Sequence, residues 1–186
     1  MLNQIRPAIV LTLLFTLLTG LAYPLAMTGI GQAAFPTQAN GSRIERDGAV
    51  IGSALIGQSF TKPGYFWSRP SATAPEVYDA AASSGSNLGP TDARLIERVQ
   101  NAVGGGKDVP ADAVTTSGSG LDPHISPENA QAQVMRVANA RGLDPHEVTQ
   151  LLARMTEWPA LGIFGEPRVN VLELNLALDQ VAPPAE

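Results

Sequence analysis

Residues 8–27 read AIVLTLLFTLLTGLAYPLAM and decide the fold of the N-terminal part of the chain. They lie in an uncharged stretch that runs from Pro7 to Ser42. Their number is close to the roughly 20 residues that a helix needs to cross the hydrocarbon core of a bilayer. A lone span must satisfy its backbone hydrogen bonds internally, so this segment is expected to form one transmembrane helix. Pro24 removes one of those bonds, at a position near the end of the span where the loss is tolerated.

A cleaved signal peptide is the alternative reading of the same segment. Arg6 would then be the basic region and Ile9–Leu18 the apolar core. Signal cores are shorter than the whole uncharged run, and no clean small-x-small cleavage site follows promptly. The sequence therefore favours a helix that is retained in the mature protein. A single pass is expected, because no other stretch stays apolar for more than a few residues.

One face of this helix carries hydroxyl and small side chains. Thr12, Thr16, Thr19 and Tyr23 recur at helical spacing, and Thr16 with Gly20 forms a small-xxx-small pair. Such residues let helices approach closely in lipid and offer hydrogen bonds across the contact. We expect this stripe to pack against a partner helix, although threonine is also tolerated on lipid-facing surfaces.

The distribution of arginines on the two sides of the helix is close to a tie. Arg6 lies on one side of the helix, and Arg43 with Arg46 lies on the other. A short tail is easily left in the cytoplasm while a large domain is exported, which favours an outside, periplasmic domain. The expected division is a cytoplasmic tail over 1–7, a transmembrane helix over 8–30, a connector over 31–46, a soluble domain over 47–182 and a tail over 183–186.

Composition excludes several classes of function. The 186 residues carry a net charge of -5, with only Lys62 and Lys107 as lysines, which argues against a nucleic-acid partner. There is no cysteine, so disulfides, thiolate metal sites and cysteine catalysis are excluded.

The soluble domain is expected to belong to the α+β class, as a small mixed domain. The predicted helices begin near Pro90, at Pro127 after a Ser126 cap, at Pro145 after an Asp144 cap, and at Val171. The first should end in the Gly104–Gly106 run and the second at Gly142. The last, Val171–Gln180, alternates like a strand, but its Leu, Glu and Ala residues favour helix. Strands are expected over Ala49–Ile56 after an Asp47-Gly48 turn, Tyr65–Trp67, Val114–Thr116 and Arg168–Val171.

Two motifs resemble a metal site and a phosphate-binding loop, but each lacks residues that such a site requires. The two histidines, His124 and His146, each end a Gly-Leu-Asp-Pro-His pentapeptide, whereas a metal site needs three or four convergent ligands. The Gly-Gly-Gly-Lys run at 104–107 departs from a phosphate-binding loop, because Asn101 and Asp108 stand where Gly and Ser or Thr are required. We predict no metal site and interpret 104–107 as a linker.

The loop that contains Ser117, Gly118, Ser119, Gly120 and Asp122 leads into the helix capped by Ser126. Backbone N–H groups at such a place can face an anion, although the same composition also makes an ordinary loop. This loop is the candidate binding element of the domain.

Blocks along nearly the whole chain resemble one family, the C subunit of Kdp-type potassium-transporting ATPases. The blocks are Leu18–Pro24 (LTGLAYP), Leu55–Phe60 (LIGQSF), Tyr65–Ser71 (YFWSRPS), Ser83–Pro90 (SSGSNLGP), Ser117–Pro127 (SGSGLDPHISP) with Gln133, Arg136 and Val137, and Gly165–Leu172 (GEPRVNVL).

The resemblance implies an accessory subunit of a bacterial inner-membrane complex that takes up potassium at the expense of ATP. Its partners would be a potassium-selecting channel-like subunit, a P-type ATPase catalytic subunit, a small membrane subunit and the lipid bilayer. The family is assigned no hydrolytic activity of its own and no intrinsic cofactor. It is commonly assigned a role as a catalytic chaperone, which raises the ATP affinity of the ATPase subunit in a transient ternary complex. Ser117–Ser126, Gln133 and Arg136 are then the candidate nucleotide contacts.

Topology conflicts with that role, because a domain outside the cell cannot meet cytoplasmic ATP. The alternative is a periplasmic cap over the channel-like subunit, for which the same residues form a partner-docking loop. An independent membrane-anchored binding protein and an exported enzyme remain as readings from other classes.

Overall fold

The computed structural model describes residues 2–104 and 108–183 of the chain. Two compact units divide between Ile51 and Gly52, and each is considered by itself. Met1 of the predicted N-terminal tail, residues 105–107 of the predicted glycine-rich linker, and residues 184–186 of the predicted C-terminal tail lie outside the described residues.

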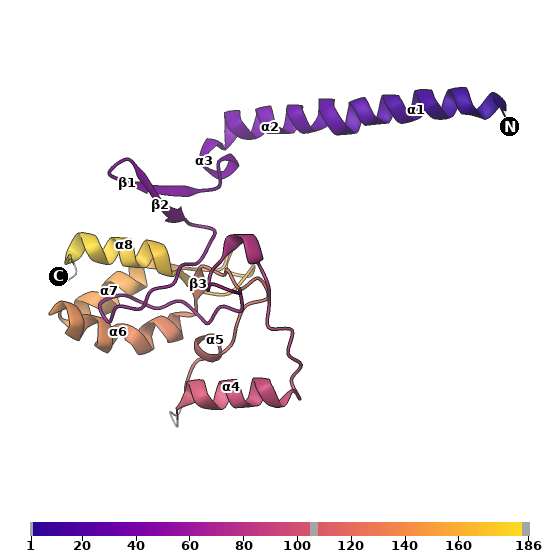
Figure 1. Cartoon of the computed structure of the whole chain (residues 1–186). Helices are drawn as coiled ribbons and strands as arrows, with labels where there is room; N and C mark the ends of the chain where they lie inside the picture. Colours follow the sequence, from indigo (N-terminus) through magenta and orange to yellow (C-terminus); the bar gives the residue numbers. More distant parts are fainter. Residues whose placement is uncertain (1, 105–107, 184–186) are drawn as a thin grey trace. The chain divides into compact units, whose positions relative to one another are not determined.

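The first unit is dominated by one long apolar helix (Figure 1). A 3-10 turn η1 (Leu2–Gln4) leads into α1 (Ile5–Leu17), a π-helical turn η2 (Leu18–Ala22) and α2 (Tyr23–Ala34). Within the described chain, Ile5–Ala34 is the one helix long and apolar enough to cross a bilayer. Its 30 residues correspond to about 45 Å at 1.5 Å per residue, the thickness of a bilayer with its headgroups. The predicted N-terminal apolar helix is confirmed, and it extends beyond 8–30 at both ends.

The π turn explains how the helix accommodates its proline. The N–H of Tyr23 bonds to the carbonyl of Leu18, five residues back, and Pro24 follows in the first turn of α2. A proline inside an α-helix clashes with the carbonyl four residues earlier and leaves it without a donor. A wider turn immediately before the ring relieves that clash, which is a recognised use of π-bulges.

A short helix α3 (Pro36–Ala39) and a hairpin follow the long helix. The hairpin pairs β1 (Arg43–Arg46) with β2 (Ala49–Ser53) across Asp47 and Gly48, whose φ values are 53° and 78°. Two central residues at positive φ are typical of the type I′ turn that suits the twist of a hairpin. The predicted turn is confirmed, and the predicted strand 49–56 ends at Ser53.

Three helices and a small antiparallel sheet form the core of the second unit. The helices are α6 (Pro127–Arg141), α7 (Pro145–Met155) and α8 (Val171–Val181). The strands are β3 (His124–Ile125), β4 (Thr156–Glu157) and β5 (Arg168–Asn170), in the order β3-β5-β4. Their apolar faces form one core that includes Phe66, Ile125, Val134, Val137, Val148, Leu152, Val169, Leu174 and Leu178. The mixed helix and strand class expected from sequence is confirmed.

Local capping signals place these helices correctly. The Ser126 hydroxyl accepts the N–H of Asn129, and the Asp144 carboxylate accepts the N–H of His146. Gly142 ends α6 in the left-handed conformation, at φ 66°. The ambiguous segment 171–180 is helical, as predicted, and the side chain of Asn170 caps it.

The prediction for Val114–Thr116 is wrong. Val114 ends a short helix α5 (Ala111–Val114), and Thr115 after it has an extended backbone but belongs to no strand. The Thr115 hydroxyl donates to the Ala111 carbonyl at 2.7 Å, so the β-branched residue closes a helical turn. The other predicted helix in this region is confirmed as α4 (Ala93–Val103), which Asp92 caps. A 3-10 turn η3 (Ala80–Ala82) precedes it.

The prediction of a strand over Tyr65–Trp67 is also wrong, because side chains replace its strand partner. The Asn175 amide accepts the Phe66 N–H at 2.8 Å and donates to the Phe66 carbonyl at 3.0 Å. The Gln133 amide does the same for Trp67, at 2.8 and 3.1 Å. Phe66 and Asn175 are buried. The segment is therefore irregular, yet its backbone is paired as firmly as in a sheet.

Asn175→Ala is expected to lower the free energy of unfolding by about 2–4 kcal/mol, because it leaves the buried N–H and carbonyl of Phe66 unpaired. Gln180→Ala, on the exposed face of the same helix, should change it by less than about 0.5 kcal/mol. Denaturant unfolding of the full chain in detergent measures both. A loss at Asn175 no larger than at Gln180 would contradict this account of the 65–67 segment.

Candidate functional site

Three side chains of the Ser117–Ser126 loop bond back to the loop's own backbone. The Ser117 hydroxyl accepts the Gly120 N–H at 2.9 Å, and the Ser119 hydroxyl accepts the Leu121 N–H at 3.1 Å. One Asp122 oxygen accepts the His124 N–H at 3.0 Å. Side-chain bonds to N–H groups two or three residues ahead are the usual way in which Ser and Asp order a turn. The loop is thus preorganised by its own sequence.

Distant segments hold the same loop from outside. The Ser71 hydroxyl donates to the Gly120 carbonyl at 2.7 Å, and the Ser84 N–H donates to the Ser119 carbonyl at 3.0 Å. Gly120 has φ 68°, and a Cβ there would lie 2.6 Å from the Ser84 carbonyl oxygen. Only glycine suits this position, for both reasons. Gly118 and Ser119 remain exposed at the outer edge.

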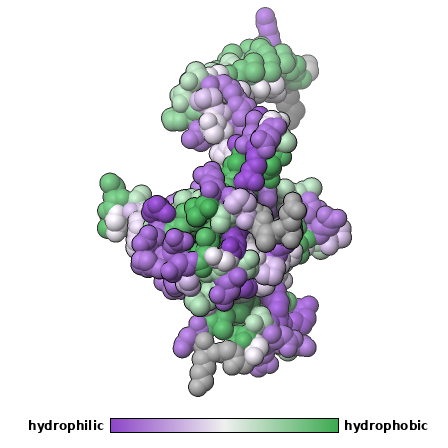
Figure 2. All heavy atoms as spheres, turned by 90° about the vertical axis from the view of Figure 1, so that its left-hand side faces the viewer, coloured by the Kyte–Doolittle hydropathy of each residue, from purple (hydrophilic) through white to green (hydrophobic). Residues whose placement is uncertain are grey.

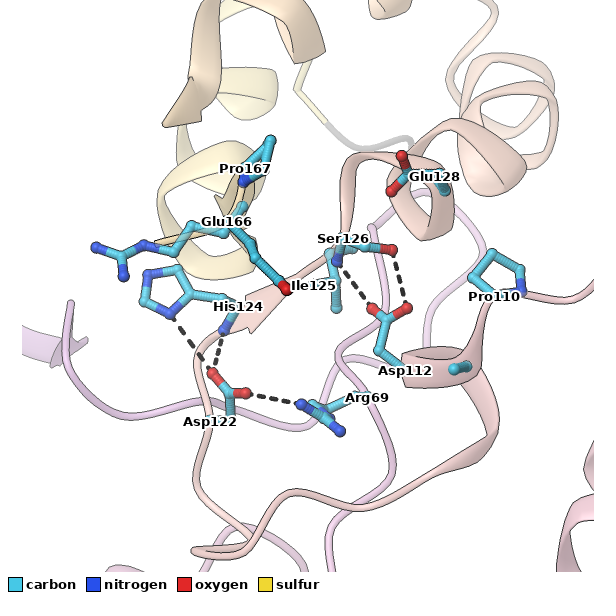
Figure 3. Close-up of a pocket in the computed structure, with 12 residues that line it drawn as sticks. Arg69, Pro110, Asp112, Asp122, His124, Ile125, Ser126, Glu128, Glu166 and Pro167 are labelled. Carbon is cyan, nitrogen blue, oxygen red and sulfur yellow. Dashed lines mark hydrogen bonds and ion pairs between the residues drawn. The ribbon is translucent and has the colours of Figure 1, made fainter. Parts of the chain in front are cut away.

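Asp122 forms the charged centre of the site with Arg69 and His124 (Figure 3). Arg69 Nη1 lies 2.9 Å from Asp122 Oδ2, and His124 Nδ1 lies 3.5 Å from Asp122 Oδ1. Burial alone would raise the pKa of Asp122. The hydrogen bonds from His124 and Arg69, with the Arg69 charge, outweigh burial and lower that pKa to about 2. Asp122 is therefore a carboxylate at any physiological pH.

Asp112 lies at the N-terminus of α6 and fills the place of an anion there (Figure 3). Its carboxylate accepts the Ser126 N–H and the Ser126 hydroxyl, each at 2.8 Å, and the Asn129 side-chain amide at 2.9 Å. Helix N-termini attract anions through their free N–H groups and their dipole. Here the carboxylate of Asp112 from α5 already lies at this end of the helix, hydrogen-bonded to Ser126 and to the Asn129 side chain.

Gln133 and Arg136, the other predicted contacts, face the 63–67 segment. Both atoms of the Gln133 amide are used, because Nε2 also donates to Asn129 at 3.0 Å and Oε1 also accepts from Arg136 at 2.6 Å. Arg136 donates to the carbonyls of Pro63 and Tyr65 at 2.6 and 2.9 Å and stacks on Trp67 at 3.7 Å. Burial lowers the pKa of Arg136 from its ordinary value. Asn129 links this pair to Ser126 and Asp112 through hydrogen bonds.

A pocket of about 670 Å³ opens beside Asp112, Asp122 and Ser126 (Figure 3). Four carboxylates and two guanidinium groups line it together with His124: Asp112, Asp122, Glu128, Glu166, Arg69 and Arg168. The excess of carboxylates favours cations over phosphorylated ligands. The described side chains contain no group of three metal-ligating His, Cys, Asp or Glu residues.

Sequence reasoning missed Arg69 and Asp112. Arg69 lies within one of the blocks that carry the family resemblance, but its pairing with Asp122 spans 53 positions and has no local signal. Asp112 is an isolated acid in a short helical turn. Only its contact with the start of α6 shows what it does.

Two hydroxyls of the predicted transmembrane face, those of Thr16 and Thr19, form hydrogen bonds within the helix. Thr16 donates to the Thr12 carbonyl and Thr19 to the Phe15 carbonyl, both at 2.7 Å. Nothing lies within 4 Å of a Cβ placed at Gly20, and Tyr23 is exposed. The π turn takes more residues per revolution than an α turn, so it shifts Tyr23 around the axis relative to the threonines.

Comparison with known proteins gives a consistent result over nearly the whole chain. The model of the family described as "K+-transporting ATPase, c chain" (KdpC) matches residues 5–180. Three relatives named as the KdpC subunit of a potassium-transporting ATPase are similar to the chain. They come from Polaromonas naphthalenivorans (56% identical; 97% of this chain and 96% of the relative covered), Sorangium cellulosum (58%; 96% and 98%) and Caulobacter vibrioides (59%; 99% and 96%).

Asp122→Asn is expected to lower the free energy of unfolding at pH 7 by about 1–2 kcal/mol. This figure is the worth of a two-unit pKa depression, reduced for partial exposure. A depressed carboxyl pKa stabilises the fold above the unfolded value near 4, and this stabilisation is lost as the pH falls toward 2. The gap between the wild type and the variant should therefore narrow between pH 4 and pH 2. Denaturant unfolding in detergent across this range measures it, and a gap independent of pH would contradict the assignment.

Proposed function

Because the chain belongs to the KdpC family, we propose that it is the non-catalytic C subunit of an ATP-driven potassium uptake complex. Its partners would be the channel-like, ATPase and small membrane subunits of that complex. The apolar helix Ile5–Ala34 supports a single-pass subunit of the bacterial inner membrane. We infer that the second unit lies on the outer side, because a short N-terminal tail is easily left in the cytoplasm while a large domain is exported.

The contacts of Asp112 are the observation that bears most directly on the choice between the two mechanisms. A nucleotide bound at the Ser117–Ser126 loop would direct its phosphates at the start of α6. It would have to displace a carboxylate that accepts three hydrogen bonds there. Gln133, the other candidate contact, has no hydrogen-bonding capacity left. These contacts favour docking of the loop on a partner subunit over binding of ATP.

The charge of the pocket supports the same choice. Its carboxylates outnumber its guanidinium groups, so it repels a triphosphate and attracts a cation. Over the outer mouth of a potassium-selecting subunit, such a surface raises the local cation concentration within a Debye length of about 8 Å. We therefore infer a periplasmic cap that assists assembly, with the exposed edge at Gly118 and Ser119 as the contact.

Replacement of Gly118 tests this docking role. Open space surrounds a Cβ at Gly118, so Gly118→Trp adds bulk to the exposed edge without a clash inside the domain. We expect at least a fivefold loss in copurification with the channel-like subunit. Gly89→Trp, also in open space but outside the loop, is the matched control and should copurify normally.

The ATP dependence of hydrolysis by the assembled complex separates docking from the chaperone role. With Gly118→Trp, the complex that still assembles should keep its KM for ATP within about twofold. A rise of tenfold or more with normal assembly would support the chaperone role instead. Normal assembly together with an unchanged KM would leave the loop without either role.

Thr16→Leu combined with Gly20→Leu should reduce copurification with the partner subunits, because bulky side chains keep helices apart in lipid. Val10→Leu combined with Leu14→Phe adds volume on the opposite face and serves as the control. Affinity purification from detergent extracts, quantified by subunit ratio, measures both. An equal effect of the two pairs would mean that the threonine stripe is not the contact.

A further inference from the structure

An apolar loop projects from the second unit between β4 and β5. Its large residues are mostly solvent-exposed: 73% for Trp158, 88% for Leu161, 74% for Ile163 and 63% for Phe164. No charged residue occurs from Trp158 to Gly165. Figure 2 shows that hydrophobic residues are exposed on the surface of the molecule among hydrophilic ones. We call residues 158–165 the apolar loop.

The backbone of the apolar loop is closed on itself. Ala160 and Phe164 exchange two hydrogen bonds, N–H to carbonyl in each direction, both at 3.0 Å. The Ile163 N–H donates to the Ala160 carbonyl at 3.2 Å, and the Gly162 N–H to the Pro159 carbonyl at 2.9 Å. The loop is therefore an ordered miniature hairpin in which these four N–H groups need no partner outside the chain.

The tip of the loop does not serve the stability of the isolated domain. Leu161 and Gly162 have φ values of 56° and 74°, the pattern of a type I′ turn. Glycine or asparagine suits such a position, whereas leucine costs about 1 kcal/mol there. A leucine that is both strained and 88% exposed gains nothing from the fold. Its side chain is explained by a contact outside the described chain.

The base of the loop fixes its direction. Glu157 on β4 and Arg168 on β5 are partners in the sheet, and Arg168 Nε lies 2.9 Å from Glu157 Oε2. The charges therefore end where the apolar loop begins. This sharp boundary between an ion pair and an uncharged tip with a tryptophan at its base is the pattern of interfacial membrane segments.

We propose that the apolar loop inserts into the headgroup and upper acyl region of the bilayer that anchors this chain. The segment between α2 and the second unit comprises residues 35–51. Fully extended, it reaches at most about 60 Å. A domain of this size has a radius of gyration near 14 Å, so the tether always keeps it close to the membrane. At such an effective concentration, even a small insertion free energy holds the loop in lipid.

Three features favour lipid over a groove on a protein partner. The tip is exposed, with Leu161 at 88%, it carries no charged or polar side chain, and the N–H groups of Gly162, Ile163 and Phe164 are bonded internally. A protein partner is usually recognised through a polar rim with hydrogen bonds across the interface, whereas the indole N–H of Trp158 is the one polar side-chain group of the apolar loop. Lipid requires only apolar surface and satisfied backbone groups. The inference depends on the anchoring helix and is independent of the docking role proposed for residues 117–126.

Tryptophan quenching in vesicles tests this proposal. The full chain is reconstituted into phosphatidylethanolamine and phosphatidylglycerol at about 3:1, with bromine atoms at the shallow or the deep end of the acyl chains. Trp158→Phe leaves only Trp67, which stacks on Arg136, so the difference between the two proteins reports Trp158. We expect shallow bromine to quench at least half of the Trp158 emission and deep bromine to quench clearly less.

Substitution at the tip provides the second arm. Leu161→Asp combined with Ile163→Asp changes only exposed positions and should reduce Trp158 quenching at least threefold, with the far-ultraviolet circular dichroism unchanged. Equal quenching of the wild type and Trp158→Phe would overturn the proposal. So would quenching that persists in the double Asp variant. Loss of complex assembly in that variant, with no quenching in the wild type, would assign the loop to a protein partner and would also overturn it.

Discussion

The pairing of two side-chain amides with the backbone of Phe66 and Trp67 is the interaction on which the second unit depends. Asn175 reaches this segment from α8, and Gln133 reaches it from α6. Each amide supplies the acceptor and the donor that a neighbouring strand would supply, so an irregular segment buries Phe66 without unpaired polar groups. The two helices are thereby joined to a stretch of chain that has no regular structure of its own.

The same network fixes the candidate loop. Gln133 bonds to Asn129, which shares the Asp112 carboxylate with Ser126 at the end of the loop. The position of the loop therefore follows from the packing of α6. Its exposed edge is preorganised, which lowers the entropic cost of recognition by a partner and suits a permanent subunit contact.

Sequence reasoning succeeded where the determinants are local. Ser126, Asp144 and Gly142 begin or end helices through bonds to residues a few positions away, and these signals can be read from the sequence. It failed at Tyr65–Trp67, because aromatic residues indicate a strand whether the backbone partner is another strand or an amide side chain. Strands β3 and β4 have two residues each and show no period. In the candidate site, the loop residues could be proposed from the sequence. Asp112 and Arg69 could not, because they act through tertiary contacts that have no local signal.

The Asp112 contacts also bear on why a loop rich in glycine and serine need not bind phosphate. Its serine hydroxyls order the loop's own N–H groups, and the Asp112 carboxylate already lies at the start of α6, bonded to Ser126. An incoming phosphate would compete with bonds that already exist, next to several further carboxylates. Glu166, which lines this acidic pocket, comes directly after the uncharged apolar loop 158–165 in the sequence. The acidic pocket suits contact with cations, and the apolar loop suits contact with lipid. Both are found around a membrane ion transporter, and neither surface suits a nucleotide.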